Sequence, residues 1–202
     1  MSQKTPRERR HQRTRDAILS AAVTLIRVEG ADKLSLRAIA REIDYSPAGL
    51  YEYFGSKDDI INAVCQQGND RLIRYLKGAD ATQSITDHLV NIGLAYVRFA
   101  HDNPEMFTLM FSTLPGPDEL PEPEDLSSED AFTVAYQAVQ AGIDAGIIAI
   151  RDDYDTLDIA YSLWAFVHGM AVLQVTHLRD FAMDYECIDR QALQAFIRGL
   201  AD

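Results

Sequence analysis

The stretch ILSAAVTLIRVEGADKLSLRAIAREIDYSPAGLYEYFGSKDDII, residues 18–61, decides the fold. Its apolar residues recur every three to four positions, which is the period of one face of an amphipathic helix. Gly30 ends the first such pattern, Ser35 begins a second as an N-cap, and Ser46-Pro47 begins a third as N-cap and first helical residue. The stretch therefore predicts three helices of about 17, 8 and 7 residues, with a four-residue turn at 44–47 between the last two.

The rest of the chain continues the helical pattern. A fourth helix is expected after Ser56, and Asn103-Pro104 repeats the pair of N-cap and first helical residue. The segment 114–127 contains four prolines and five acidic residues, which is typical of a solvated loop. Further helices are expected at about 82–101, 128–146, 155–179 and 187–201. No strand-like alternation is present, so we expect an all-α chain of about nine helices.

Charge is divided unevenly along the chain, whose formal net charge is −12. Residues 1–57 carry 11 Lys and Arg against 7 Asp and Glu, a net of +4, whereas residues 58–202 carry 8 against 24, a net of −16. A basic head on an acidic body suggests that only the head faces a polyanion such as DNA. We therefore expect a small domain at 1–57, opening with a flexible basic arm at 1–12 that becomes helical near Pro6, and a larger helical domain at 58–202.

The three N-terminal helices have the lengths and the connecting turn of a helix-turn-helix. In that motif a short recognition helix enters the major groove, and small residues at its start let the backbone approach the DNA. Here the helix starts with Ser46, Pro47, Ala48 and Gly49. Hydroxyls and cations around it would hold phosphates, which fix the register without reading sequence.

Residues 14–60 resemble the N-terminal domain of the TetR family of repressors. The family pattern is present in order: an Ala-rich first helix, a glycine, a Ser-x-Arg-x-Ile-Ala start, then Leu-Tyr-x-x-Phe and a lysine. The resemblance implies a repressor that reads a pseudo-palindromic operator as a homodimer. It also implies that the domain at 58–202 dimerises and binds a small effector that releases the DNA.

The resemblance also implies roles for individual residues. Arg37 would reach a base edge or a phosphate, since arginine suits bidentate contact with guanine. Tyr51 and Tyr53 would place hydroxyls on phosphates or base edges, and Lys57 would add its charge to the positive end of the fourth helix. The alternatives are that Tyr51 packs inward and that Arg37 and Lys57 are ordinary solvated charges. The full predicted DNA-binding set is Ser35, Arg37, Ser46, Pro47, Ala48, Gly49, Tyr51, Tyr53 and Lys57, with Leu50 and Phe54 matching core positions.

Two residues depart from the family pattern. Asp44 stands where the family usually has glycine, so the turn must tolerate its Cβ, for which an Asx-turn is one route. Glu52 puts a negative charge on the recognition helix, which either accepts from a cytosine amine or points to solvent. Direct base readout is therefore expected to be sparse, with a contribution from DNA shape. The N-terminal arginines either follow the DNA or form a tail without a specific role; these are Arg7, Arg9, Arg10, Arg13 and Arg15.

The C-terminal part resembles one subfamily more particularly. Trp164-x-x-x-His168-Gly169 looks like the Trp…His-Gly signature of a subfamily called WHG, and 103–111 resembles a segment seen there. Trp164 and His168 are four residues apart and share a helix face with Tyr161. The pair either lines an apolar pocket with one polar handle or packs in the core. The predicted effector-binding set is Tyr96, Phe99, Phe107, Phe111, Trp164 and His168.

The sequence contains no HExxH, CxxC, P-loop, GxSxG or GxGxxG motif. His168 and His177 are nine residues apart, about 180° around a helix, so they cannot chelate one ion together. Cys65 and Cys187 have no metal-like spacing and are expected to be reduced thiols. We therefore expect no enzymatic activity, no cofactor and no metal.

The apolar segment 157–175 should be central or lie in an oligomer interface. It is too short and too polar for a clean membrane span, and no signal peptide is evident, so a soluble cytoplasmic protein is expected. The expected partners are double-stranded DNA, a small-molecule effector and a second copy, bound through the last two helices. The alternatives are a constitutive, ligand-independent DNA-binding regulator and a helical ligand- or partner-binding module without DNA function.

Overall fold

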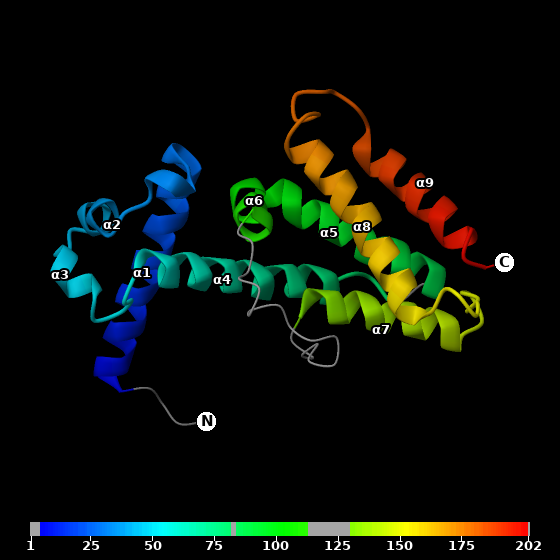
Figure 1. Cartoon of the computed structure of the whole chain (residues 1–202), viewed down its shortest axis with the longest axis horizontal. Helices are drawn as coiled ribbons and strands as arrows, with labels where there is room; N and C mark the ends of the chain where they lie inside the picture. The colour runs from blue at the N-terminus through cyan, green and yellow to red at the C-terminus, as the bar shows by residue number, and fades with distance from the viewer. Residues whose placement is uncertain (1–4, 82–83, 113–129, 202) are drawn as a thin grey trace. The chain divides into compact units, whose positions relative to one another are not determined.

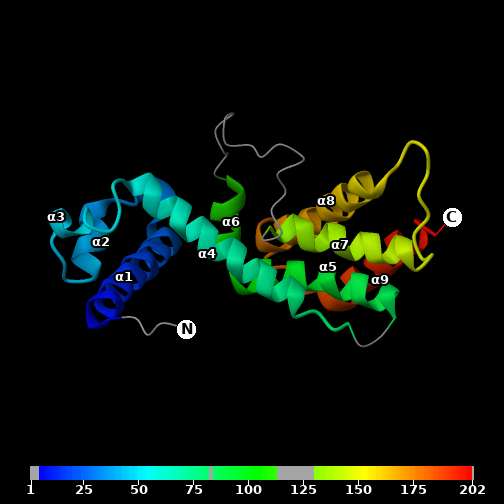
Figure 2. The same ribbon diagram turned by 90° about the horizontal axis from the view of Figure 1, so that it is seen from below.

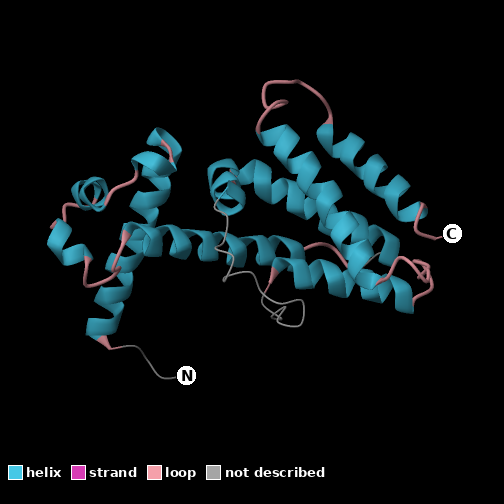
Figure 3. Cartoon of the chain, viewed as in Figure 1, coloured by secondary structure: helices cyan, strands magenta, loops and turns pink. Residues whose placement is uncertain are grey.

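A computed structural model describes residues 5–81, 84–112 and 130–201 of the chain. The expected loop at 114–127 lies outside these residues. The described part is all-α, as predicted, and contains nine α-helices and one short 3-10 helix without a named strand (Figures 1 and 3). The elements are α1 (Pro6–Glu29), η1 (Ala31–Lys33), α2 (Leu36–Glu42), α3 (Pro47–Leu50), α4 (Lys57–Lys77), α5 (Ile85–Asp102), α6 (Pro104–Ser112), α7 (Ala131–Asp144), α8 (Thr156–Val175) and α9 (Tyr185–Arg198).

The described residues of the chain divide into two compact units. The N-terminal unit comprises Met1–Gly68 and Thr108–Thr113, and the C-terminal unit comprises Asn69–Phe107 and Leu114–Asp202. The division falls within α4, which begins in one unit and ends in the other.

In the N-terminal unit, α1 packs against η1 and α2, and α2 packs against α3. The apolar face of α1 buries Ile18, Ala22 and Leu25 against this cluster. The helix begins at Pro6, where the basic arm was expected to become helical, because Thr5 and Glu8 form a capping box and Pro6 occupies the first position. Residues 6–12 of the expected arm are therefore helical in the structure.

In the C-terminal unit, α5 is the central helix and contacts α7, α8 and α9 (Figure 2). Nearly all of its middle turns are buried, including Val90, Tyr96 and Phe99. Gly93 permits the close approach of α9, because a Cβ at this position would lie 2.9 Å from both methyl carbons of Leu193.

Helix α8 is the one described helix that is long and apolar enough to cross a membrane by length and composition. A core helix of a globular protein passes the same test, and α8 packs against α5 and α7. Its other side exposes Leu157, Tyr161, Ala165, Gly169 and Leu173 at four-residue intervals. The apolar character therefore serves a core on one side and leaves an apolar stripe on the other.

Candidate nucleic-acid interface

The turn before α3 is closed by the backbone. Asp44 has φ +52°, in the left-handed region, and the Tyr45 N–H donates to the carbonyl of Ala40 at 2.8 Å. This is the six-residue bond of a Schellman motif, which normally places glycine at the position of Asp44. The turn does tolerate the Cβ of Asp44, at the cost of a backbone conformation that favours glycine.

Side-chain caps set the starts of α2 and α3. The Ser35 hydroxyl accepts from the Ala38 N–H at 3.2 Å, and the Ser46 hydroxyl accepts from the Gly49 N–H at 3.0 Å. Pro47 follows as the first residue of α3. Both serines lie where the sequence predicted N-caps. Each hydroxyl oxygen accepts from a backbone N–H, and its O–H remains able to donate to a phosphate oxygen.

The start of α3 presents small, exposed residues. Ser46, Pro47 and Ala48 are exposed, and the Tyr51 side chain is 61% exposed. Leu50 and Phe54 are buried, as predicted, and hold the segment onto the N-terminal unit. The α-helix itself ends at Leu50, and residues 51–53 continue as turn, so the helical part is shorter than the expected seven residues.

Tyr53 is more enclosed than Tyr51. Its ring lies 4.6 Å from the ring of His11 and 6.2 Å from that of Tyr45, and its carbonyl accepts from Arg15 Nη1 at 3.5 Å. The Arg15 guanidinium also lies over the Phe54 ring, 4.4 Å from its centroid. Arg15 is thus a packing residue between α1 and the segment after α3, a role that the sequence analysis did not foresee.

Tyr45 is the functional candidate that sequence reasoning missed. The Tyr45 ring lies against Gly49 at the start of α3. A Cβ at residue 49 would lie 2.6 Å from Tyr45 Cε1, so this contact requires glycine there. The hydrogen bond with the Tyr53 side chain raises the pKa of Tyr45, a phenol that is protonated at neutral pH with or without this shift. The spacing of four residues between Tyr45 and Gly49 was the sequence feature from which this contact could have been predicted.

The start of α4 combines a cap with mixed charge. The Ser56 hydroxyl accepts from the Asp59 N–H at 3.0 Å, and Lys57 is the first helical residue. Asp58 and Asp59 follow in the first turn and are exposed. Arg37 is exposed on the first turn of α2. The N-terminal unit therefore displays two candidate phosphate contacts, Arg37 and Lys57, of which only the second has carboxylates beside it in sequence.

In the C-terminal unit, four of the six predicted effector residues form one aromatic cluster. The Tyr96 ring lies 4.9 Å from the Trp164 ring and 6.0 Å from that of Phe107. His168 Nδ1 lies 2.9 Å from the Tyr96 hydroxyl, and its ring lies 5.4 Å from the Phe107 ring. Burial lowers the pKa of His168 and raises that of Tyr96, so both side chains favour the neutral form.

The cluster is closely packed. The cavity bounded by Tyr96, Trp164 and their neighbours has a volume of about 10 Å³, the lower limit for one water molecule. Phe132, which the sequence analysis did not name, packs on the other side of Trp164 at 5.8 Å. Tyr96 and Phe107 are buried, whereas Trp164 and His168 are partly exposed, so these rings pack against one another rather than around an open pocket.

Of the remaining two predicted effector residues, Phe99 belongs to the C-terminal unit and Phe111 to the N-terminal unit. Phe99 is fully buried, and its ring packs against Tyr75 at 5.6 Å. Phe111 belongs to the N-terminal unit and is partly exposed. Within the described residues there is no group of three or more His, Cys, Asp and Glu side chains that could hold a metal ion.

Two family models match the chain. Residues 18–64 match "Bacterial regulatory proteins, tetR family", and residues 89–196 match "Tetracyclin repressor-like, C-terminal domain". The first match contains the turn and the exposed start of α3, and the second contains the cluster around Trp164.

Curated relatives are regulators of the helix-turn-helix type. The HTH-type transcriptional regulator Rv0681 of Mycobacterium tuberculosis is 26% identical over 83% of this chain and 72% of its own length. The regulator Rv1816 of the same species is 28% identical over 61% of this chain, which spans 55% of the length of that relative.

Solved structures share the fold over nearly the whole chain. A Rhodococcus sp. RHA1 protein is 26% identical with a TM-score of 0.76, covering 93% of this chain and 95% of its own. The regulatory protein SCO4313 is 27% identical with a TM-score of 0.72, over 96% and 100% of the two chains. A tetR-family regulatory protein from Rhodococcus RHA1, 19% identical with a TM-score of 0.69 over 92% and 96% of the chains, shows the same fold.

Proposed function

Because this chain belongs to the TetR family of bacterial regulatory proteins, we propose that it is a repressor that binds a pseudo-palindromic operator as a homodimer. A small-molecule effector releases it from the DNA. It acts by binding alone, in the cytoplasm, and without a metal or a cofactor.

One observation carries the DNA-binding proposal: the start of α3 is capped, small and exposed. Ser46, Pro47 and Ala48 have no bulky side chain and point to solvent, so the backbone can approach a major groove closely. Arg37 and Tyr51 are exposed on neighbouring elements and supply donors to base edges and phosphates. This surface holds most of the predicted DNA-binding residues, with Tyr45 added to them.

The dimer proposal rests on the exposed stripe of α8. Its apolar residues recur every four positions, as in a helix that packs against another helix, and nothing within 4 Å would meet a Cβ on Gly169. Gly169 therefore has no close neighbour within the described part of its own chain, and the close approach that it allows is available to a second copy. The Phe166 ring of α8 stacks on Phe196 of α9 at 5.1 Å, so the two helices form one surface.

The effector proposal requires movement in the aromatic cluster. A pocket for a small molecule has a volume of roughly 300 Å³ or more, against about 10 Å³ beside Trp164. An effector at Tyr96, Trp164 and His168 would have to displace these rings and thereby favour a second conformation. Its effect on DNA affinity can be no larger than the ratio of its own affinities for the two conformations.

The small volume of this cavity favours a second candidate function, a regulator that binds DNA without any effector. Its C-terminal unit would serve only dimerisation. Titration of hydrophobic small molecules against the Trp164 fluorescence separates the two candidates, because Trp164 is the only tryptophan in the chain. A saturable change that is lost in Tyr96→Ala supports an effector at the cluster.

The DNA-binding proposal is tested by selecting bound sequences from a random DNA library and measuring affinity in gel shifts. We expect Arg37→Ala and Lys57→Ala each to weaken binding about tenfold. Arg151→Ala is the matched control, because Arg151 is an exposed arginine of the C-terminal unit. Recovery of no enriched sequence, or equal losses in all three variants, would contradict the proposal.

A further inference from the structure

A polar pocket in the C-terminal unit is lined by arginines from three helices. Arg74 of α4, Arg98 of α5 and Arg190 of α9 border a pocket of about 520 Å³ together with Tyr75, Asn91 and Asp80. This volume lies in the range of small-molecule sites. The pocket shares no residue with the aromatic cluster around Trp164.

The concentration of arginines is unusual for this part of the chain. Residues 58–202 contain eight Lys and Arg against 24 Asp and Glu, yet three of these eight line one pocket. Asp80 is the one carboxylate residue among the described residues that border it. The pocket is therefore locally cationic within a strongly acidic body. Without a bound anion, the three like charges repel one another.

Two of the arginines are not neutralised by the protein. Among the described residues, no carboxylate lies within 4.0 Å of the Arg74 or Arg98 guanidinium. Both side chains are exposed, so they are solvated at present and open to a ligand. The carboxylate of Asp102, on the same helix as Arg98, accepts from the Tyr75 hydroxyl at 2.9 Å.

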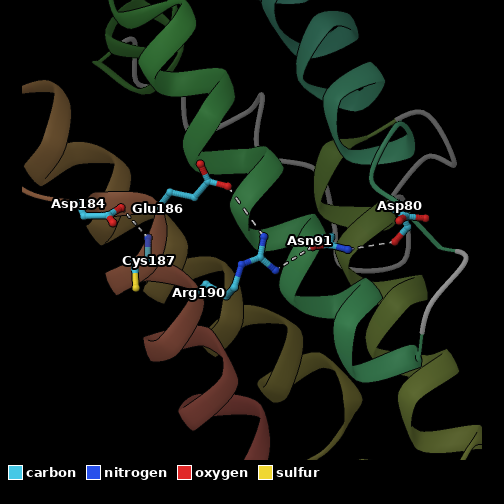
Figure 4. A network of polar contacts seen from close by, with 6 residues as sticks. All are labelled: Asp80, Asn91, Asp184, Glu186, Cys187 and Arg190. Carbon is cyan, nitrogen blue, oxygen red and sulfur yellow. Dashed lines mark hydrogen bonds and ion pairs between the residues drawn. The ribbon is translucent and has the colours of Figure 1, made fainter.

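Arg190 is held in place by a polar network (Figure 4). Its Nη1 donates to Asn91 Oδ1 at 3.4 Å, and its Nη2 lies 4.0 Å from Glu186 Oε1. Asn91 in turn donates from Nδ2 to the Asp80 carbonyl at 3.3 Å. This network links α9 to α5 and the segment after α4, and it restrains one guanidinium beside the pocket, which lowers the entropic cost of binding.

The pocket lies away from the proposed dimer surface. On α9, Arg190 and Phe196 are six residues apart, which places them roughly 120° apart around the helix. Phe196 faces α8, where it stacks on Phe166, whereas Arg190 faces Asn91 of α5. A second copy bound on the α8 stripe would therefore leave the arginine pocket accessible.

We propose that this pocket binds a small, multiply charged oxyanion, of the phosphate-ester or polycarboxylate class. Three guanidinium groups offer planar, paired N–H donors, the geometry that both phosphate and carboxylate oxygens accept. A singly charged anion would leave part of the pocket's positive charge unpaired. The pocket should therefore prefer anions that carry more than one negative charge. This site is additional to the effector cluster, and its occupancy does not depend on DNA binding.

The test is calorimetric titration of the full-length protein with pyrophosphate and with citrate, in 0.15 M chloride to screen unspecific attraction. We expect at least one of them to bind in a 1:1 ratio per chain and to raise the melting temperature. Which of the two binds assigns the class as phosphate or carboxylate. Glycerol, which is neutral, should not bind.

Arg98→Gln and Arg190→Gln should each weaken that binding about tenfold or more, because each removes a charge-assisted pair. Arg98→Lys should lose less affinity, since lysine keeps the positive charge but lacks the paired N–H donors of the guanidinium. Arg151→Gln is the control and should bind like the wild type. The proposal is overturned if neither anion binds at millimolar concentration, or if Arg151→Gln loses as much affinity as Arg98→Gln while circular dichroism shows all variants folded.

Discussion

At the scale of single residues, Asp44 shows how one side chain stores strain in the turn of the DNA-binding unit. Its φ of +52° is costly for any residue with a Cβ, although Asp tolerates the region better than most. We expect Asp44→Gly to stabilise the protein by about 0.5–1 kcal/mol, because glycine adopts this conformation without a steric penalty. The measurement is the midpoint of urea unfolding.

Asp44→Ala is the matched control for the same position. Alanine keeps the Cβ and loses any local hydrogen bonding by the carboxylate, so its midpoint should fall below that of the wild type. Equal midpoints for the alanine and glycine variants would show that backbone strain at Asp44 does not limit stability.

At the scale of elements, the crossing of α5 and α9 depends on the absence of a side chain at residue 93. A Cβ there would lie 2.9 Å from both methyl carbons of Leu193 and 3.2 Å from Val167 Cγ1, all in the core. Overpacking costs about 1–3 kcal/mol, against a gain of about 1 kcal/mol in helix propensity. We expect Gly93→Ala to lower the free energy of unfolding by about 1 kcal/mol.

A double-mutant cycle isolates this contact. Leu193→Ala alone should cost about 2–5 kcal/mol, but in that background Gly93→Ala should become neutral or stabilising because its neighbour is gone. If Gly93→Ala destabilises both backgrounds equally, the crossing of α5 and α9 is not what requires glycine at this position.

The elements themselves were largely predictable from the sequence, because their caps and apolar periods are local signals. Ser35, Ser46 and Ser56 each accept a backbone hydrogen bond where an N-cap was expected. The start of α1 near Pro6 was expected, although the polar residues 6–12 have no apolar period and were described as an arm. The capping box of Thr5 and Glu8 sets this start in the structure.

The sites were less predictable, since they depend on contacts between distant residues. The pair of Trp164 and His168 could be placed on one helix face, but their partner Tyr96 is about 70 residues away in sequence and meets them only through packing. Phe99 was predicted with them from its aromatic character, yet the helical phase of α5 directs it to Tyr75. The arginine pocket draws on three helices and leaves no pattern in the sequence.

At the scale of the whole molecule, the proposed function depends on assembly, because one copy presents only one recognition helix. A pseudo-palindromic operator needs two of them about 34–36 Å apart, and the exposed stripe of α8 is the surface proposed to hold them together. In a two-fold symmetric dimer each interface residue occurs once in each copy, so a single substitution changes the interface at two places. We therefore expect the proposed dimer to be unusually sensitive to one charge on this stripe.

Tyr161 is the most exposed of the large apolar residues on α8, at 67%, and is the second of the five residues of the stripe. Tyr161→Asp should raise the dimer dissociation constant at least a hundredfold, because burying an unpaired carboxylate costs about 3 kcal/mol or more. Light scattering during size-exclusion chromatography should then show a folded monomer, with weaker operator binding.

Ile150→Asp, at an exposed apolar position outside α8 and α9, should remain dimeric. A Tyr161→Asp protein that stays dimeric would move the interface off this stripe, and a monomer that binds the operator as tightly as the wild type would remove the need for a dimer.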